Sequence, residues 1–225
     1  MITKEEGDRI FSNLTKVSSL TLGAFSIALA IMAIRGSSPL GQRVYSKDGR
    51  YLISVRYGDW HDLREFVTPY DPAVQEVYSH VGPNAWQLLD FVCRNVSYRR
   101  DIGEFWQFPS ETLRGHGDCE DSAVLLTSLI RASGAPNCYV ALGSLGGYGH
   151  AWVLNNNEIL ETTYTRARPI PDPQNYCPYC LFSESEVIEL WPGALGELFE
   201  LGRDEQLKLN LVAEALSEGI DHGAF

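Results

Sequence analysis

One segment of the chain, residues 115–134, predicts a buried helix that begins at a cysteine. Its sequence is GHGDCEDSAVLLTSLIRASG, in which apolar residues recur at helical spacing and Gly134 supplies the stop. Asp118 is a strong N-cap residue, and Asp121 three positions later forms an acidic variant of the capping box. Cys119 is then the first helical residue, where the positive end of the helix dipole favours a thiolate over a thiol.

The acidic neighbours of Cys119 act in the opposite direction. Asp118, Glu120 and Asp121 place negative charge beside the sulfur. The dipole alone therefore does not suffice, and a cationic imidazole is needed to hold a thiolate. A buried core cysteine under a well-capped helix is the alternative interpretation.

A candidate imidazole is that of His150, in a predicted β-hairpin. Residues 137–145 predict one strand, and residues 150–165 predict a hairpin that turns at three consecutive asparagines. Side chains alternate between the two faces of a strand. His150 and Glu161 therefore share a face when the numbers of two residues directly opposite each other in the hairpin add up to an odd value. A two-residue turn leaves them diagonal neighbours, a four-residue turn sets them opposite, and a three-residue turn separates them. On a shared face, the carboxylate can orient and charge the imidazole.

These residues carry a resemblance to a known family. The order of Cys119 in GHGDCEDSA, His150 in GYGHAWV and Glu161 in ILETT resembles the transglutaminase-like superfamily, of the prokaryotic transglutaminase-like cysteine peptidase type. The segments DPAVQEVY and WQFPSETL also resemble the region upstream of the nucleophile in prokaryotic members. The likeness covers about residues 68–190.

The resemblance implies an α+β, papain-like fold in which a helix that carries the nucleophile packs on an antiparallel β-sheet. It also implies a thiol nucleophile, a histidine base and acid, and an orienting acid, which match Cys119, His150 and Glu161. Members usually have aspartate at the last position, so the longer glutamate must lie further back or bend. Relatives place an oxyanion donor upstream, and Gln107 and Trp106 are the candidates here, with a core aromatic cluster as the alternative.

A second motif, Cys177-Pro178-Tyr179-Cys180, resembles the CxxC redox motif of thioredoxin-like proteins. It follows three prolines in a predicted loop, and no second cysteine pair lies within zinc-site spacing. A loop or local disulfide is favoured over redox chemistry and over metal binding. We therefore expect no cofactor and no metal.

The N-terminal part contains an uncharged run, residues 17–34, of sequence VSSLTLGAFSIALAIMAI. As a helix it would span about 27 Å, enough for the hydrocarbon core of a membrane. We expect an uncleaved single-pass anchor over residues 17–35, with a cleaved signal peptide and a buried helix as alternatives. Basic residues lie on both sides of the run, so they do not assign its orientation.

The organisation and charge complete the prediction. We expect a leader over residues 1–16, the membrane segment over 17–35, a linker and β-hairpin over 36–67, the catalytic domain over 68–190 and an acidic amphipathic helical segment over 191–225. The net charge is −11, and nineteen acidic against six basic residues lie in positions 101–225. This excess opposes phosphate backbones and excludes nucleic-acid binding through that half.

The predicted function is thiol-dependent acyl transfer by a membrane-anchored enzyme on a peptide or protein substrate. Hydrolysis of a peptide or side-chain amide bond is favoured over transamidation, because no separate amine-docking feature is present. One alternative is a non-catalytic, membrane-anchored interaction domain of the same fold. A second alternative is a thiol oxidoreductase that uses Cys177 and Cys180.

Overall fold

The computed structural model describes residues 44–56, 58–100 and 105–200. Its strands are β1 (Val44–Lys47), β2 (Arg50–Arg56), β3 (Asp59–Asp62), β4 (Ser97–Tyr98), β5 (His116–Gly117), β6 (Cys138–Leu145), β7 (Tyr148–Asn155), β8 (Glu158–Leu160), β9 (Tyr176–Phe182) and β10 (Val187–Glu189). Its helices are η1 (Leu63–Phe66), α3 (Pro72–Val81), α4 (Ala85–Asn95), α5 (Pro109–Thr112), α6 (Cys119–Arg131) and η2 (Pro173–Asn175).

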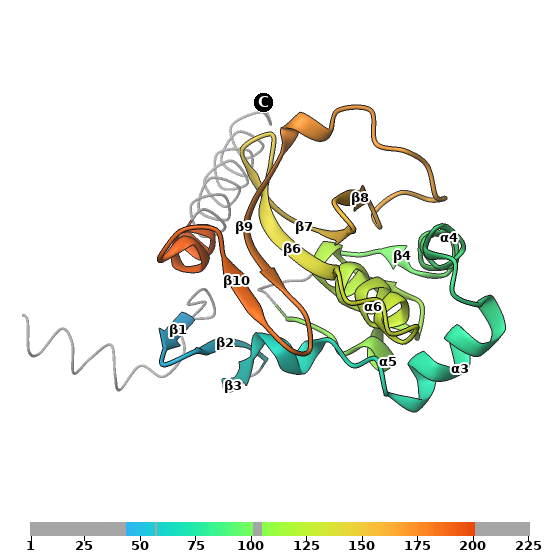
Figure 1. Cartoon of the computed structure of the whole chain (residues 1–225), viewed down its shortest axis with the longest axis horizontal. Coiled ribbons are helices and arrows are strands. Elements are labelled where there is room, and N and C mark those ends of the chain that lie inside the picture. Colours follow the sequence, from blue (N-terminus) through green and yellow to red (C-terminus); the bar gives the residue numbers. More distant parts are fainter. Residues whose placement is uncertain (1–43, 57, 101–104, 201–225) are drawn as a thin grey trace, which may run out of the picture. The chain divides into compact units, whose positions relative to one another are not determined.

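Helix α6 packs against an antiparallel sheet whose strand order is β10-β9-β6-β7-β8 (Figure 1). Every residue of α6 from Glu120 to Ile130 is buried, and its leucines join Val140 and Val153 of the sheet in one hydrophobic core. Helices α3, α4 and α5 contact α6 as well. A buried helix on an antiparallel sheet confirms the predicted α+β, transglutaminase-like fold.

The start of α6 depends on local side-chain chemistry. Asp118 and Asp121 form the predicted capping box, and the backbone N–H of Asp118 donates to Asp121 Oδ2 at 3.3 Å. A Cβ atom at Gly117 would lie 2.7 Å from the Cβ of Asp121, so the chain needs glycine where it approaches the helix. The cap and this close approach together fix Cys119 as the first residue of α6.

Helices α3 and α4 begin at the expected type of cap residue. The Asp71 side chain accepts the N–H of Ala73 at 2.8 Å, and Pro72 occupies the first position of α3. The Asn84 side chain accepts the N–H of Trp86 at 3.0 Å at the start of α4. These caps fix the first residues of α3 and α4.

Two-residue turns set the register of the hairpins. The β7–β8 turn has Asn156 at a φ of 49° and Asn157 at 66°, and it pairs Asn155 with Glu158. This is the two-residue possibility, which leaves His150 and Glu161 as diagonal neighbours on one face. The predicted β1–β2 hairpin is also present, with Lys47 paired to Arg50.

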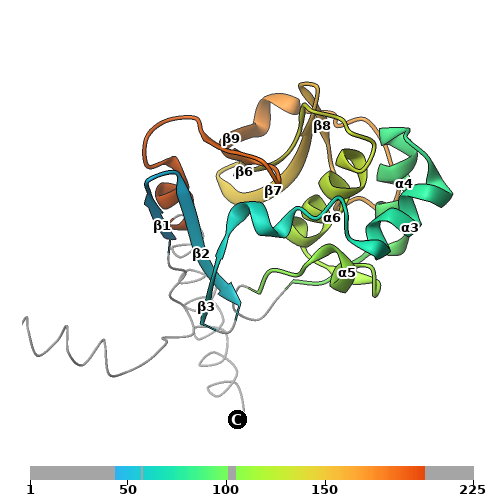
Figure 2. The ribbon, with the colours of Figure 1, turned by 60° about the horizontal axis from the view of Figure 1, so that its bottom comes forward.

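The structure departs from the sequence-based expectations in two places. Strand β3 was not expected, and it forms a separate three-stranded sheet with β1 and β2 (Figure 2). The CxxC motif lies on strand β9, not in a loop, because β9 pairs with β6 from Val140 to Leu145. A register shift next to Gly143 lets the strand accommodate Pro178.

The expected membrane segment, residues 17–35, lies outside the described residues. Over the parts of the chain that are described, no helix is both long and apolar enough to cross a membrane. Of the expected acidic amphipathic segment over residues 191–225, positions 201–225 also lie outside the described residues.

Candidate active site

The nucleophile candidate, Cys119, lies where α6 meets strand β7. Its sulfur accepts a hydrogen bond from the backbone N–H of Ala151, the residue that follows His150. The residue is partly exposed and packs against the hydrophobic core. The fold thus brings Cys119 next to the strand that carries His150.

The thiol of Cys119 is held in its protonated form in this arrangement. Burial is the largest cause that raises its pKa well above the usual value, and the charges of Glu120 and Asp118 raise the pKa further. The thiol donates to Glu120 Oε2 at 3.1 Å, which also favours the protonated form, while the Ala151 N–H opposes it. The acidic neighbours therefore outweigh the helix dipole, and ionisation needs a proton acceptor.

The acceptor candidate, His150, contacts a buried carboxylate through its far nitrogen. Its Nε2 lies 2.8 Å from Glu161 Oε2, and the side chains of His150 and Glu161 are 13% and 1% exposed. A carboxylate accepts hydrogen bonds, so this contact holds the proton on Nε2 and leaves Nδ1 for proton exchange. The ring of His150 also stacks on buried Trp152, with centroids 6.0 Å apart.

Four donors surround the Glu161 carboxylate. Thr163 donates its backbone N–H and its hydroxyl to Oε1 at 2.9 and 2.7 Å. Tyr176 donates its hydroxyl to Oε2 at 2.9 Å, beside the His150 contact. Burial raises the pKa of Glu161, but the hydrogen bonds from His150 and Thr163 outweigh it, so the pKa is lowered overall. Glu161 is therefore ionised at neutral pH.

The oxyanion candidates lie just before α5, and they differ in surroundings. The backbone N–H of Gln107 donates to Asp121 Oδ1 at 2.7 Å, which joins Gln107 to the first turn of α6. Trp106 lies in an aromatic cluster between Phe66 and Phe182, with centroids at 5.3 and 6.2 Å. Its buried indole N–H has no hydrogen-bond partner among the described residues. Gln107 is thus the residue held against the nucleophile helix, whereas Trp106 belongs to the core.

Tyr98 and His116 lie near the nucleophile on the paired strands β4 and β5. Tyr98 pairs with Gly117, and its pKa is raised to about 12 by burial and by the nearby Cys119 and Asp118. His116 is exposed, three residues before the sulfur.

The CxxC cysteines do not form a redox pair in this arrangement. Cys177 is exposed, whereas Cys180 is fully buried and free. Burial raises the pKa of Cys180 to about 12, which opposes its reaction as a thiolate. The expectation of a loop or local disulfide is thus wrong for these two residues, and the structure gives no support to the oxidoreductase alternative.

No metal-binding cluster is formed by the described residues: they contain no group of three or more His, Cys, Asp or Glu side chains that could hold an ion.

Two residues of this site were missed by the sequence analysis. Thr163 follows Glu161 by two positions, and a threonine there can cap the carboxylate locally, so this signal was available. Tyr176 is 15 residues from Glu161 and comes from a different strand. No local pattern could have indicated it.

Comparisons with known proteins agree with the fold. The family described as the transglutaminase-like superfamily matches residues 55–154. This match supports the resemblance to the transglutaminase-like superfamily for residues 55–154. The match includes Cys119 and His150 and ends before Glu161.

Solved structures of Legionella pneumophila LapG are also similar to this chain. The EGTA-treated form has 16% identity and a TM-score of 0.44, and the match covers 54% of this chain and 76% of that one. A second LapG structure has 17% identity and a TM-score of 0.43, with 59% and 84% covered. The calcium-bound form has 18% identity and a TM-score of 0.37, with 57% and 96% covered. No curated protein sequence matches the chain.

Proposed function

We propose that the protein is a thiol-dependent acyl-transfer enzyme of the cysteine peptidase type, with Cys119 as nucleophile, His150 as base and acid, and Glu161 as the orienting acid. The observation that carries this proposal is the 2.8 Å contact between His150 Nε2 and a buried, ionised Glu161. Such a carboxylate orients the imidazole of a catalytic triad and stabilises its charged form. Peptides or proteins are the proposed substrates.

The reaction begins at a protonated thiol. As a carbonyl carbon approaches, His150 removes the proton from Cys119, and the sulfur attacks the carbon to form a C–S bond. Glu161 stabilises the imidazolium that results. The backbone N–H of Cys119 and the side chain of Gln107 are the proposed donors to the tetrahedral oxyanion.

The second half of the reaction releases both products. The C–N bond breaks as His150 returns its proton to the departing amine, which leaves a thioester on Cys119. Water, deprotonated by His150, then attacks the thioester carbonyl and frees the acid and the thiol. An amine in place of water would give transamidation.

A labelling experiment tests the proposal. An activity-based acyl electrophile that carries a peptide side chain is expected to modify the wild-type chain once, and Cys119→Ser is expected to abolish the label. Cys177→Ser is the matched control, because Cys177 is an exposed thiol away from α6, and it should label like the wild type. Equal labelling of the Cys119→Ser variant would contradict the proposal. A peptide library then identifies the bond that is cleaved.

One observation favours a second candidate, a non-catalytic interaction domain of the same fold. The thiol of Cys119 donates to Glu120 at 3.1 Å, and this contact keeps the sulfur protonated. If this contact persists when a substrate carbonyl is present, the site cannot react. Absence of labelling in the folded wild-type chain would support this candidate.

A further inference from the structure

The hydroxyl of Tyr176 reaches the same carboxylate oxygen that binds His150. Glu161 Oε2 accepts from His150 Nε2 at 2.8 Å and from Tyr176 at 2.9 Å, while both hydrogen bonds from Thr163 go to Oε1. The two donors on Oε2 thus share one set of lone pairs. Any change in one of these hydrogen bonds changes the strength of the other.

The ring of Tyr176 is fixed by packing that does not depend on its hydroxyl. Tyr176 is the first residue of β9, where it pairs with Leu145, and its backbone N–H donates to Pro173. Its ring meets Trp152 edge to face at 5.1 Å and lies 6.2 Å from His150. Removal of the hydroxyl alone would therefore leave the ring in place.

The hydroxyl itself lies among acceptors. Burial and the charge of Glu161 both raise the pKa of Tyr176, and a hydrogen bond with Tyr164 adds to this effect. Tyr176 is therefore a neutral donor throughout the range in which an imidazole titrates. Its effect on Glu161 is that of a constant hydrogen bond.

The surroundings of Glu161 and His150 include other charged and titratable groups, and they come from each neighbouring element. Cys93 on α4 and Tyr176 on β9 interact with Glu161 directly, and Cys119 at the start of α6 contacts the backbone N–H of Ala151 beside His150. Further charged groups act on these neighbours: Asp90 and Arg94 on Cys93, Asp118 and Glu120 on Cys119, and Tyr164, with Arg168 over its ring, on Tyr176. Cys93 also donates to the backbone oxygen of Glu161 at 3.7 Å. Among the described residues, only Tyr176 donates a further hydrogen bond to the carboxylate oxygen that contacts His150.

We infer that Tyr176 is a positioning residue that acts on His150 through Glu161 and sets the pH at which the imidazolium loses its proton. A donor on Oε2 disperses the negative charge of the carboxylate, so Tyr176 weakens its attraction for the imidazolium. Without the hydroxyl, the imidazolium is held more strongly and persists to higher pH. The inference deepens the proposed function and rests on it for its catalytic meaning.

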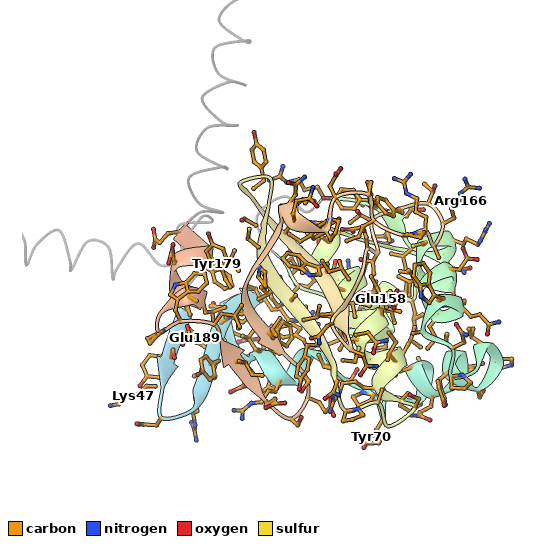
Figure 3. The ribbon with its side chains drawn as sticks, turned by 45° about the horizontal axis from the view of Figure 1, so that its top comes forward. Lys47, Tyr70, Glu158, Arg166, Tyr179 and Glu189 are labelled. Atoms are coloured by element: carbon orange, nitrogen blue, oxygen red, sulfur yellow. The ribbon has the colours of Figure 1, made fainter. Side chains whose placement is uncertain are left out.

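An NMR titration of the full chain tests this inference. Histidine is isotopically labelled, and the signal of His150 among the five histidines is assigned with His150→Asn. In Tyr176→Phe, the midpoint of the His150 titration is expected to move to higher pH by about 0.7 unit, the size of one ordinary hydrogen bond. Tyr179→Phe is the matched control, because it makes the same change three residues along β9 (Figure 3). The ring of Tyr179 packs on Trp191.

A double variant shows whether the effect passes through the acid. In Glu161→Gln, addition of Tyr176→Phe is expected to leave the midpoint unchanged, because the shared charge is gone. The inference would be overturned by an unchanged or lowered midpoint in Tyr176→Phe, by an equal shift in Tyr179→Phe, or by a shift that persists beside Glu161→Gln.

Thermal unfolding separates this role from a structural one. Tyr176→Phe is expected to unfold at the same temperature as Tyr179→Phe, and a much lower temperature would also overturn the inference. The titration does not require turnover. If Cys119 is not labelled but the His150 midpoint moves in Tyr176→Phe, the proposed function is wrong and the coupling between Tyr176 and His150 stands. If Cys119 is labelled but the midpoint does not move, only the inference is wrong.

Discussion

The substitution Glu161→Gln separates the orienting acid from the rest of the site. It keeps the shape of the side chain but replaces one accepting oxygen by an amide NH₂, which cannot accept. Each carboxylate oxygen of Glu161 accepts two hydrogen bonds, so one pair of donors loses its acceptor. Since Glu161 is 1% exposed, water cannot replace that acceptor. We expect a loss of roughly 2–4 kcal/mol in the free energy of unfolding.

The expected effect on the reaction is larger, because the imidazolium loses its counter-charge. Loss of the orienting acid in an acid-base-nucleophile triad costs on the order of 10²–10⁴ in rate. The assay is the rate at which the acyl electrophile labels Cys119, followed by intact-mass measurement at neutral pH. Glu158→Gln is the matched control, since Glu158 lies at the exposed turn of the same hairpin (Figure 3) and is expected to leave the rate unchanged. Equal rates for Glu161→Gln and the wild type would refute the assignment.

The stability difference also depends on pH, with a sign that follows from the lowered pKa of Glu161. The folded pKa lies below the usual 4.5, so the charged carboxylate stabilises the folded state above that pH. This contribution is lost as the pH falls through the folded value. The difference in the free energy of unfolding between the wild type and Glu161→Gln, measured with denaturant, is therefore expected to become smaller below about pH 4.5. A difference that grows on acidification would contradict the ionised state of Glu161.

Three further predictions concern the scaffold and the remaining motifs. Gly143→Ala is expected to lower the melting temperature strongly, because the new Cβ would lie 2.1 Å from the backbone oxygen of Cys177. Gly149→Ala is the control and should have little effect, because no atom lies within 4 Å of a Cβ at that position. Cys180→Ala is expected to retain Cys119 labelling, and a lost label with intact fold would indicate a role for the buried thiol. Deletion of residues 1–35 is expected to move the chain from the membrane fraction to the supernatant on cell fractionation, and an unchanged distribution would contradict the proposed anchor.

Much of the site was predictable because its determinants are local. The caps at Asp71, Asn84 and Asp118 act within three residues, so the sequence alone places the starts of three helices. In the structure the Asn156-Asn157 turn, with positive φ at both positions, forms the two-residue hairpin and places His150 and Glu161 on one face. The sequence left three turn lengths open, and only two of them give this shared face.

The parts that were missed depend on pairing between distant segments. Strand β9 forms because Gly143 of β6 has no side chain, which lets the backbone of Cys177 and Pro178 approach closely. A run that contains proline does not predict such a strand by itself. Tyr176 reaches Glu161 only through this pairing, so its hydrogen bond could not be read from the sequence.

The sequence predicts that the acidic neighbours of Cys119 oppose ionisation of its thiol, and the structure shows how they do so. The Glu120 carboxylate accepts a hydrogen bond from the thiol of Cys119, and the pKa of Cys119 is raised. The resting sulfur is therefore a thiol. The residue pattern alone predicts a thiolate held by an imidazolium. The physical reason for the difference is that burial and two neighbouring carboxylates outweigh a single helix dipole.

The most direct test of the account is the rate at which iodoacetamide alkylates Cys119 at neutral pH when His150 is replaced. Because the sulfur of Cys119 has acidic neighbours, it should react rapidly only when an imidazole accepts its proton. We expect His150→Asn to slow alkylation at least about 100-fold, while His116→Asn, which removes the exposed histidine three residues before the sulfur, leaves the rate unchanged. Equal alkylation of the wild type and His150→Asn would contradict the account, because the histidine would then have no part in activating the thiol.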